Sequence, residues 1–127
     1  NAQKVAQFLQ GDDRIAWVTY PGLPGDKNYE LAQKYMPHGT CGVVSFGIKG
    51  GREAARQFMD ALKMIVIATH VADLRSCLLH PASTTHRQMS DEQLAEAGVT
   101  PDLVRLSVGI EHVEDIIEDI TQALNSL

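Results

Sequence analysis

The chain has 127 residues, of which 44% are hydrophobic and 21% are charged, and its formal net charge at pH 7 is −5. This length and balance are typical of one globular domain. The longest apolar run, residues 64–68, is too short to cross a bilayer. The acidic charge argues against nucleic acid as a partner, because phosphate binding requires a basic surface. We therefore expect neither a membrane nor a nucleic acid as partner.

The two cysteines and the first residues indicate where the chain comes from. Cys41 and Cys77 have no C-x-x-C spacing and fit a reducing compartment, so we expect a cytoplasmic protein in which both are buried as small hydrophobic residues. The chain begins with Asn1 and runs directly into a helical pattern, which suggests a part cut from a longer chain.

The first half of the chain predicts two helices and two strands. Apolar residues from Val5 to Leu9 share one helical face that Gly11 ends, and residues 14–20 are β-branched and aromatic, as in a strand. Residues 21–26, rich in proline and glycine, predict a loop. A short helix over residues 28–36 and an alternating strand over residues 41–48 follow.

The second half predicts three strands and three helices. Residues 52–63 form an amphipathic helical pattern, residues 64–68 a buried strand and residues 76–79 a short strand. Ser90 and Gln93 form a capping box that opens a short helix, the alternation of residues 103–108 predicts a strand, and residues 113–124 predict a final helix. This order predicts an α/β fold: a two-layer α+β sandwich over residues 1–127, with the helices packed mainly on one face of a single sheet.

Metal and phosphate sites have little support. None of the five histidines has the spacing of a zinc site. The glycine-rich residues 47–51 lead into a helix, where free N–H groups can hold an anion. They lack the full phosphate-loop spacing, so we favour a tight strand-to-helix turn over an anion site.

One arginine interrupts an apolar strand. Arg105 stands among valine and leucine, so it is either an edge residue that points to solvent or a buried cation that needs an anion. A guanidinium pairs with a carboxylate through two parallel hydrogen bonds, which makes a carboxylate its natural partner. Residues 80–86 (HPASTTH), rich in small hydroxyl side chains, predict a loop.

These two segments carry a family resemblance. HPASTTH at residues 80–86 and RLSVGIE at residues 105–111 resemble the C-terminal domain of the pyridoxal-phosphate (PLP) enzymes of cysteine and methionine metabolism. The likeness extends to residues 20–23, to residues 42–51 and to the final helix. It implies the small C-terminal domain of fold-type I PLP enzymes, with a mostly antiparallel sheet.

The resemblance also implies roles for residues. Arg105 would bind the α-carboxylate of the substrate, and Thr85 would lie beside Arg105 and help to hold it. The family's Ser/Asn-x-Gly-Asp segment falls on residues 70–73, here HVAD. Its first residue and the following N–H contact the same carboxylate, which implies His70 and the Val71 N–H. Because histidine and alanine replace the usual residues, either His70 donates a hydrogen bond or the Val71 N–H acts alone.

The cofactor follows from the resemblance as well. PLP would serve the full-length enzyme, whose PLP-carrying lysine follows a threonine in a large N-terminal domain, whereas no lysine here follows a threonine. We therefore expect no catalytic residue, no bound PLP and no activity in this chain alone. Its expected partners are the missing N-terminal PLP domain of the same chain, a small amino-acid substrate and, in the full protein, further copies in a tetramer.

The residues around His86 favour one branch of the family. The Arg-Gln pair after HPASTTH is more like the O-acetylhomoserine sulfhydrylases, which make homocysteine from O-acetylhomoserine and sulfide, than the lyases. The alternatives are a cystathionine γ-synthase, a cystathionine γ-lyase, a methionine γ-lyase, or a carboxylate-binding module without catalysis.

Overall fold

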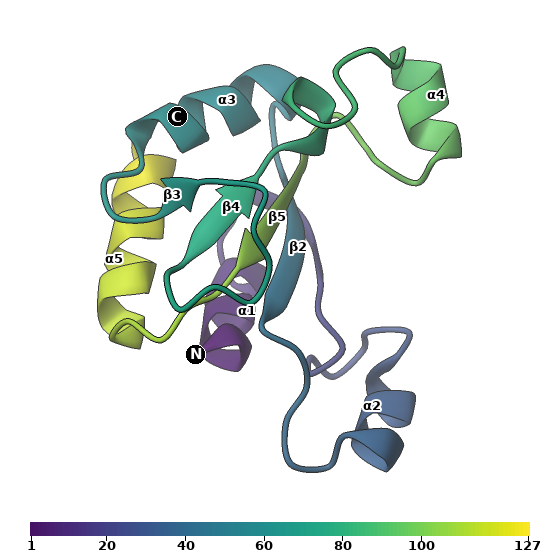
Figure 1. Cartoon of the computed structure of the whole chain (residues 1–127), viewed down its shortest axis with the longest axis vertical. Helices are drawn as coiled ribbons and strands as arrows, with labels where there is room; N and C mark the ends of the chain where they lie inside the picture. The colour runs from purple at the N-terminus through teal and green to yellow at the C-terminus, as the bar shows by residue number, and fades with distance from the viewer.

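A computed structural model describes all residues from Asn1 to Leu127. Three helices lie against one side of a sheet, and two short helices, α2 and α4, project from opposite ends of the molecule (Figure 1). The elements are, in chain order, α1 (Ala2–Gln10), β1 (Ile15–Thr19), α2 (Tyr29–Tyr35), β2 (Val43–Ile48), α3 (Gly51–Ala61), β3 (Val66–Ile67), β4 (Cys77–Leu79), the 3₁₀ turn η1 (Pro81–Ser83), α4 (Asp91–Glu96), β5 (Leu103–Ser107) and α5 (Val113–Leu124).

The five strands form one sheet in the order β1-β2-β5-β4-β3. The pairs β1–β2, β2–β5 and β5–β4 are antiparallel, whereas β3 runs parallel to β4. This arrangement confirms the predicted α+β sandwich, and the sheet is mixed rather than purely antiparallel. Strand β5 lies at its centre, between β2 and β4.

The core lies between the sheet and the helices α1, α3 and α5. Alternate residues of β2 and β5, among them Phe46, Val104 and Leu106, are buried in this core. Phe46 meets Phe58 of α3 edge to face, with 6.1 Å between the ring centroids. The period of two along both strands therefore sends one set of side chains into the core and the other set to the opposite face.

A buried carboxylate fixes the chain where it leaves α3. Asp119 of α5 accepts hydrogen bonds from the backbone N–H groups of Lys63, Met64 and Ile65, at 2.9, 2.9 and 2.8 Å. Burial acts to raise the pKa of Asp119, but these three donors together outweigh burial and hold the pKa below its usual range. The ionised carboxylate thus joins α5 to the connection between α3 and β3.

Two sequence predictions of burial are wrong. The strand predicted over residues 64–68 shrinks to β3, whose Val66 and Ile67 are 37% and 51% exposed, because β3 pairs only with β4 at the edge of the sheet. Cys77 is buried as expected, but Cys41 is exposed, because it precedes β2 rather than lying within it.

The helix predicted over residues 28–36 forms as α2, but its apolar side is largely uncovered. Leu31 and Tyr35 are 56% and 69% exposed, and only Ala32 is buried. No helix of the structure is long and apolar enough to cross a membrane.

Candidate substrate site

The candidate site lies on the face of the sheet opposite the helices. Arg105 projects from β5 on this face, and its cross-strand neighbours are Ser45 of β2 and Leu79 of β4. Because β5 is the central strand, Arg105 cannot be the edge residue that the sequence left open. The loop between β3 and β4 crosses in front of the sheet on this side (Figure 1).

The guanidinium of Arg105 is held by this loop but is not neutralised. Its Nη2 donates to the carbonyl oxygens of Thr69 and His70, at 3.0 and 3.4 Å. Its Nε is buried without a hydrogen-bond partner, and no carboxylate of the chain forms an ion pair with it. Arg105 as a whole is half-buried, but its buried Nε lacks an acceptor and its charge lacks a counter-ion, so the arrangement favours an anionic ligand.

The loop keeps a backbone conformation that alanine rarely adopts. Ala72 has a φ of 61°, at the position where the family resemblance expects glycine. Its N–H donates to the Ser107 hydroxyl of β5 at 3.1 Å. The neighbouring His70 and Val71 side chains are exposed, and the Val71 N–H makes no hydrogen bond within the chain. The structure therefore brings His70 and Val71 close to Arg105 through the backbone.

Thr85 lies differently from the expected arrangement. Its hydroxyl is exposed and interacts with the ring Nδ1 of His86 at 2.8 Å, and it makes no hydrogen bond with Arg105. Thr84 instead donates its hydroxyl to the carbonyl of His80 at 2.9 Å. The role predicted for Thr85 stays a prediction.

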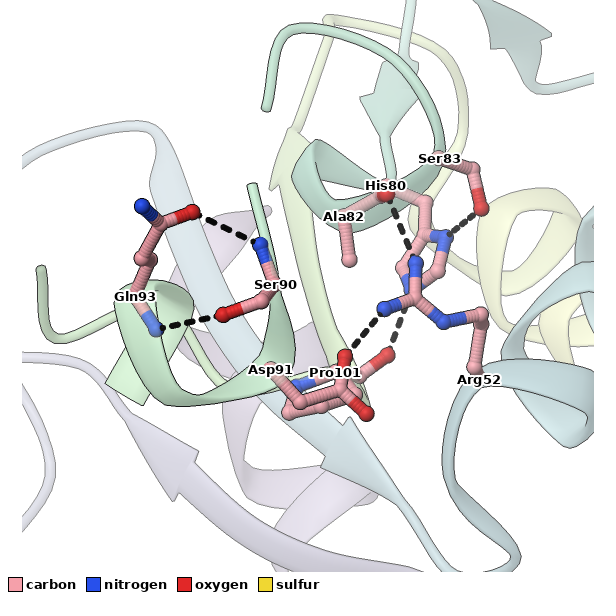
Figure 2. Close-up of polar contacts among 8 residues, drawn as sticks. All are labelled: Arg52, His80, Ala82, Ser83, Ser90, Asp91, Gln93 and Pro101. Atoms are coloured by element: carbon pink, nitrogen blue, oxygen red, sulfur yellow. Dashed lines mark hydrogen bonds and ion pairs between the residues drawn. The ribbon is translucent and has the colours of Figure 1, made fainter. Parts of the chain in front are cut away.

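A polar cluster fixes the start of the HPASTTH segment (Figure 2). The ring of His80 is fully buried, with Nδ1 at 2.7 Å from the Ser83 hydroxyl and Nε2 at 2.7 Å from the Pro101 carbonyl. Arg52 of α3 donates to the Ala82 carbonyl at 2.7 Å and pairs with Asp91 at 2.6 Å. The loop is thus fastened to α3 and α4.

Burial also keeps His80 neutral. Desolvation lowers the pKa of its imidazole below the usual value, against the opposing effect of the Pro101 carbonyl. A neutral ring carries one N–H, so it can donate to one of its two neighbours and accept from the other. His80 therefore acts as a fixed structural connector between η1 and the start of β5.

Sequence reasoning missed two of the residues that hold these loops. Ser107 and Arg52 received no role, although Ser107 belongs to the RLSVGIE motif. The signal for Ser107 was available: it is two residues after Arg105 in a strand and so shares its face. Arg52 gave no such signal, because its partners Ala82 and Asp91 are 30 and 39 residues away.

Two other sequence interpretations can be compared with the structure. No group of three or more His, Cys, Asp or Glu side chains is arranged to hold a metal ion. The glycines of residues 47–51 form the expected tight turn, in which Gly50 and Gly51 have φ values of 102° and 69° and α3 begins at once.

Comparison with known proteins identifies the family of this chain. The sequence profile of the Cys/Met metabolism PLP-dependent enzymes matches residues 1–125. The chain belongs to this family. The family's enzymes depend on PLP, which is the cofactor that the resemblance implied.

Similar proteins point to one branch of the family. The chain is 48% identical to an O-acetyl-L-homoserine sulfhydrylase of Leptospira meyeri over all of its own length, and 48% identical to O-acetyl-L-homoserine sulfhydrylase 1 of Thermus thermophilus over 98% of it. A crystal structure from Campylobacter jejuni, assigned as an O-acetylhomoserine (thiol)-lyase and containing N′-pyridoxyl-lysine-5′-monophosphate, is 39% identical over 98% of the chain, with a TM-score of 0.89. The chain spans 29%, 30% and 30% of the lengths of these three proteins.

Proposed function

We propose that this chain is the substrate-binding part of a PLP-dependent O-acetylhomoserine sulfhydrylase, in which Arg105 binds the α-carboxylate of the amino acid. The observation that carries this proposal is the guanidinium of Arg105, which is fixed by two loop carbonyls and has no anionic partner. The names of the similar sulfhydrylases support the choice of reaction.

The two carbonyl contacts explain how Arg105 could serve a carboxylate. Both are made by Nη2, so they orient the guanidinium plane while leaving Nη1 and Nε without partners in the chain. A carboxylate offers two oxygens in the plane of the fork, and charge-assisted bonds of this kind are stronger than neutral ones. A carboxylate at the Nη1–Nη2 edge of the fork would therefore occupy Nη1, which the fold leaves without a partner.

The loop supplies a further donor for the same ligand. The Val71 N–H is unpaired and lies next to the His70 carbonyl that contacts Arg105. We propose that this N–H assists in carboxylate binding, while the exposed imidazole of His70 contributes a hydrogen bond only if the rest of the protein directs it inward. Thr85, whose hydroxyl contacts His86, would have to exchange that partner to help hold Arg105.

The residues of this chain fit the substrate rather than the cofactor. The five lysines, at positions 4, 27, 34, 49 and 63, all lie outside β4, β5 and the loop that contacts Arg105.

When bound, PLP serves as an electron sink for the carbon atoms of the amino acid. In the proposed reaction the bond between the γ-carbon and oxygen breaks, acetate leaves, and sulfide forms the new bond at the γ-carbon, giving homocysteine. Arg105 would orient the amino acid for this chemistry.

Replacing Arg105 in the full-length enzyme tests the proposal. Arg105→Ala should raise KM for O-acetylhomoserine by about a hundredfold, because a charge-assisted bidentate contact is lost. Arg105→Lys should give a smaller increase, since a lysine keeps the charge but not the planar fork. Steady-state kinetics at varied O-acetylhomoserine and saturating sulfide would measure both.

Cofactor retention is the control for this experiment. Both variants should bind PLP as the unchanged enzyme does, as judged by the absorbance of the purified protein. An unchanged KM in Arg105→Ala would remove the carboxylate assignment. Turnover of methionine or cystathionine in place of O-acetylhomoserine would keep Arg105 but assign another branch of the family.

The remaining proposals concern partners. The chain spans about 30% of its similar proteins. We propose that its main partner is the rest of a longer chain, which would carry PLP, and that the full protein forms a tetramer. Light scattering of the full-length protein would measure the mass of the assembly.

A further inference from the structure

We propose that Glu111 is a positioning residue for the carboxylate site, because it fixes the far end of the loop whose near end holds Arg105. This inference rests on the proposed function of Arg105. The motif RLSVGIE then contains both the cation and the group that sets the position of the backbone around it.

Glu111 holds Ser76 with both of its carboxylate oxygens. The backbone N–H of Ser76 donates to Oε1 at 2.6 Å, and the Ser76 hydroxyl donates to Oε2 at 2.9 Å. The same hydroxyl accepts the N–H of Gly109 at 2.9 Å. Ser76 is fully buried, so its N–H and hydroxyl cannot exchange Glu111 for water without the loop moving.

The space around Gly109 shows how closely the loop follows the end of the motif. A Cβ atom at this position would collide with the Leu74 carbonyl, the Ser76 nitrogen and the Glu111 carboxylate. The next residue, Ile110, donates its N–H to that Leu74 carbonyl at 2.9 Å. Leu74 and Ser76 are therefore packed directly against residues 109–111.

Residues of the RLSVGIE motif hold both ends of the loop between β3 and β4. At one end, Arg105 and Ser107 bind Thr69, His70 and Ala72. At the other end, Ile110 and Glu111 bind Leu74 and Ser76. Arg105 provides the charged donor at one end and Glu111 the charged acceptor at the other, and charge-assisted hydrogen bonds are stronger than neutral ones. Its loss should let the loop shift while β5 and Arg105 stay in place.

Two substitutions in the full-length enzyme test this role. Glu111→Ala removes both acceptors and should raise KM for O-acetylhomoserine about tenfold with a much smaller change in kcat, because the misplaced loop weakens ground-state and transition-state binding alike. Glu111→Gln keeps an oxygen for the Ser76 N–H but turns a donor toward the Ser76 hydroxyl. It should raise KM about threefold, between the unchanged enzyme and Glu111→Ala.

Asp26→Asn serves as a matched control. The Asp26 carboxylate likewise accepts from two protein donors, the N–H groups of Tyr20 and Asn28, at 3.0 and 2.8 Å, but it shares no partner with the loop. This variant should lose stability in thermal unfolding while its KM stays unchanged. A KM that rises equally in Asp26→Asn and Glu111→Gln would show a general effect of destabilisation and overturn the inference.

Arg105→Lys separates the two proposals. If Arg105→Lys raises KM and neither Glu111 variant does, the carboxylate site stands and the role of Glu111 is wrong. If Arg105→Lys and Arg105→Ala leave KM unchanged, the proposed function itself fails. The expected result is a raised KM in the variants of both residues with PLP binding retained.

Discussion

At the scale of single residues, the site combines an unpaired cation with a strained alanine. Arg105 keeps donors free beside the loop, and Ala72 holds a positive φ within that loop. Such a backbone conformation costs a non-glycine residue roughly 1 kcal/mol or more and persists only where other contacts impose it. Here the contact is the hydrogen bond from the Ala72 N–H to Ser107.

Ala72→Gly should therefore stabilise the protein. Glycine adopts a positive φ without steric cost, and the gain should be about 0.5–1 kcal/mol after its larger conformational freedom in the unfolded chain is subtracted. Urea unfolding would measure the change. The control is Ala95→Gly in α4, where the backbone is helical and the same substitution should destabilise. A loss of stability in Ala72→Gly would contradict the assignment of strain.

The sequence allowed Arg105 to be predicted, and the family resemblance placed residues 70–73 beside it, but the backbone contacts that hold Arg105 could not be predicted. A charged residue inside an apolar strand is visible in the sequence, and its preference for a carboxylate follows from the shape of the guanidinium. The carbonyls of Thr69 and His70 could not be foreseen, because they lie about 35 residues away and their position depends on how the loop folds. The side-chain position of Thr85 depends on the same kind of loop geometry.

At the scale of elements, one carboxylate determines how α5 meets the end of α3. Asp119 accepts three consecutive backbone N–H groups that no strand or helix satisfies. Asp119→Asn can offer only one oxygen and should cost about 1–3 kcal/mol at pH 7, because buried N–H groups lose their acceptor. Urea unfolding would measure this cost against Glu118→Gln, an exposed change one residue earlier that should be nearly neutral.

The pH dependence gives a second test of Asp119. Its pKa is lower in the folded protein than in the unfolded chain, so its contribution to stability is present at neutral pH and is lost as the pH falls below about 4. The difference in unfolding free energy between the unchanged protein and Asp119→Asn should shrink over that range. A difference that stays constant down to pH 3 would mean that the folded and unfolded pKa values do not differ.

Among the elements, the spacing of apolar residues predicted whether a segment is a helix or a strand better than it predicted which side chains are exposed. The long patterns of α1, α3, α5, β2 and β5 were predicted because each repeats its apolar residues over enough turns or pleats to define a face. The two residues of β3 are too few to show whether a strand lies at the edge or the centre of a sheet. Likewise, the apolar side of α2 indicates a helix but does not indicate what covers it.

At the scale of the whole molecule, the proposed function makes this chain one side of a catalytic site. It has the proposed carboxylate-binding arginine, and its five lysines all lie outside the segments that form that site. We expect residues 1–127 alone to give no turnover of O-acetylhomoserine with sulfide and no saturable absorbance band when mixed with PLP. Spectrophotometric titration of the purified chain would check this, with the full-length enzyme as the positive control, and a stable band with turnover would contradict it.

The alternation along β5 has a consequence for how this part of the protein can change over evolutionary time. Val104 and Leu106 face the core, while Arg105 and Ser107 face the loop. Adding or removing a single amino acid within this strand would exchange the two sets, carrying a guanidinium into the hydrocarbon interior and leaving a leucine beneath the ligand. Single substitutions in β5 keep this alternation, whereas insertions and deletions within the strand do not, so its length and register should be more strongly constrained than its individual residues.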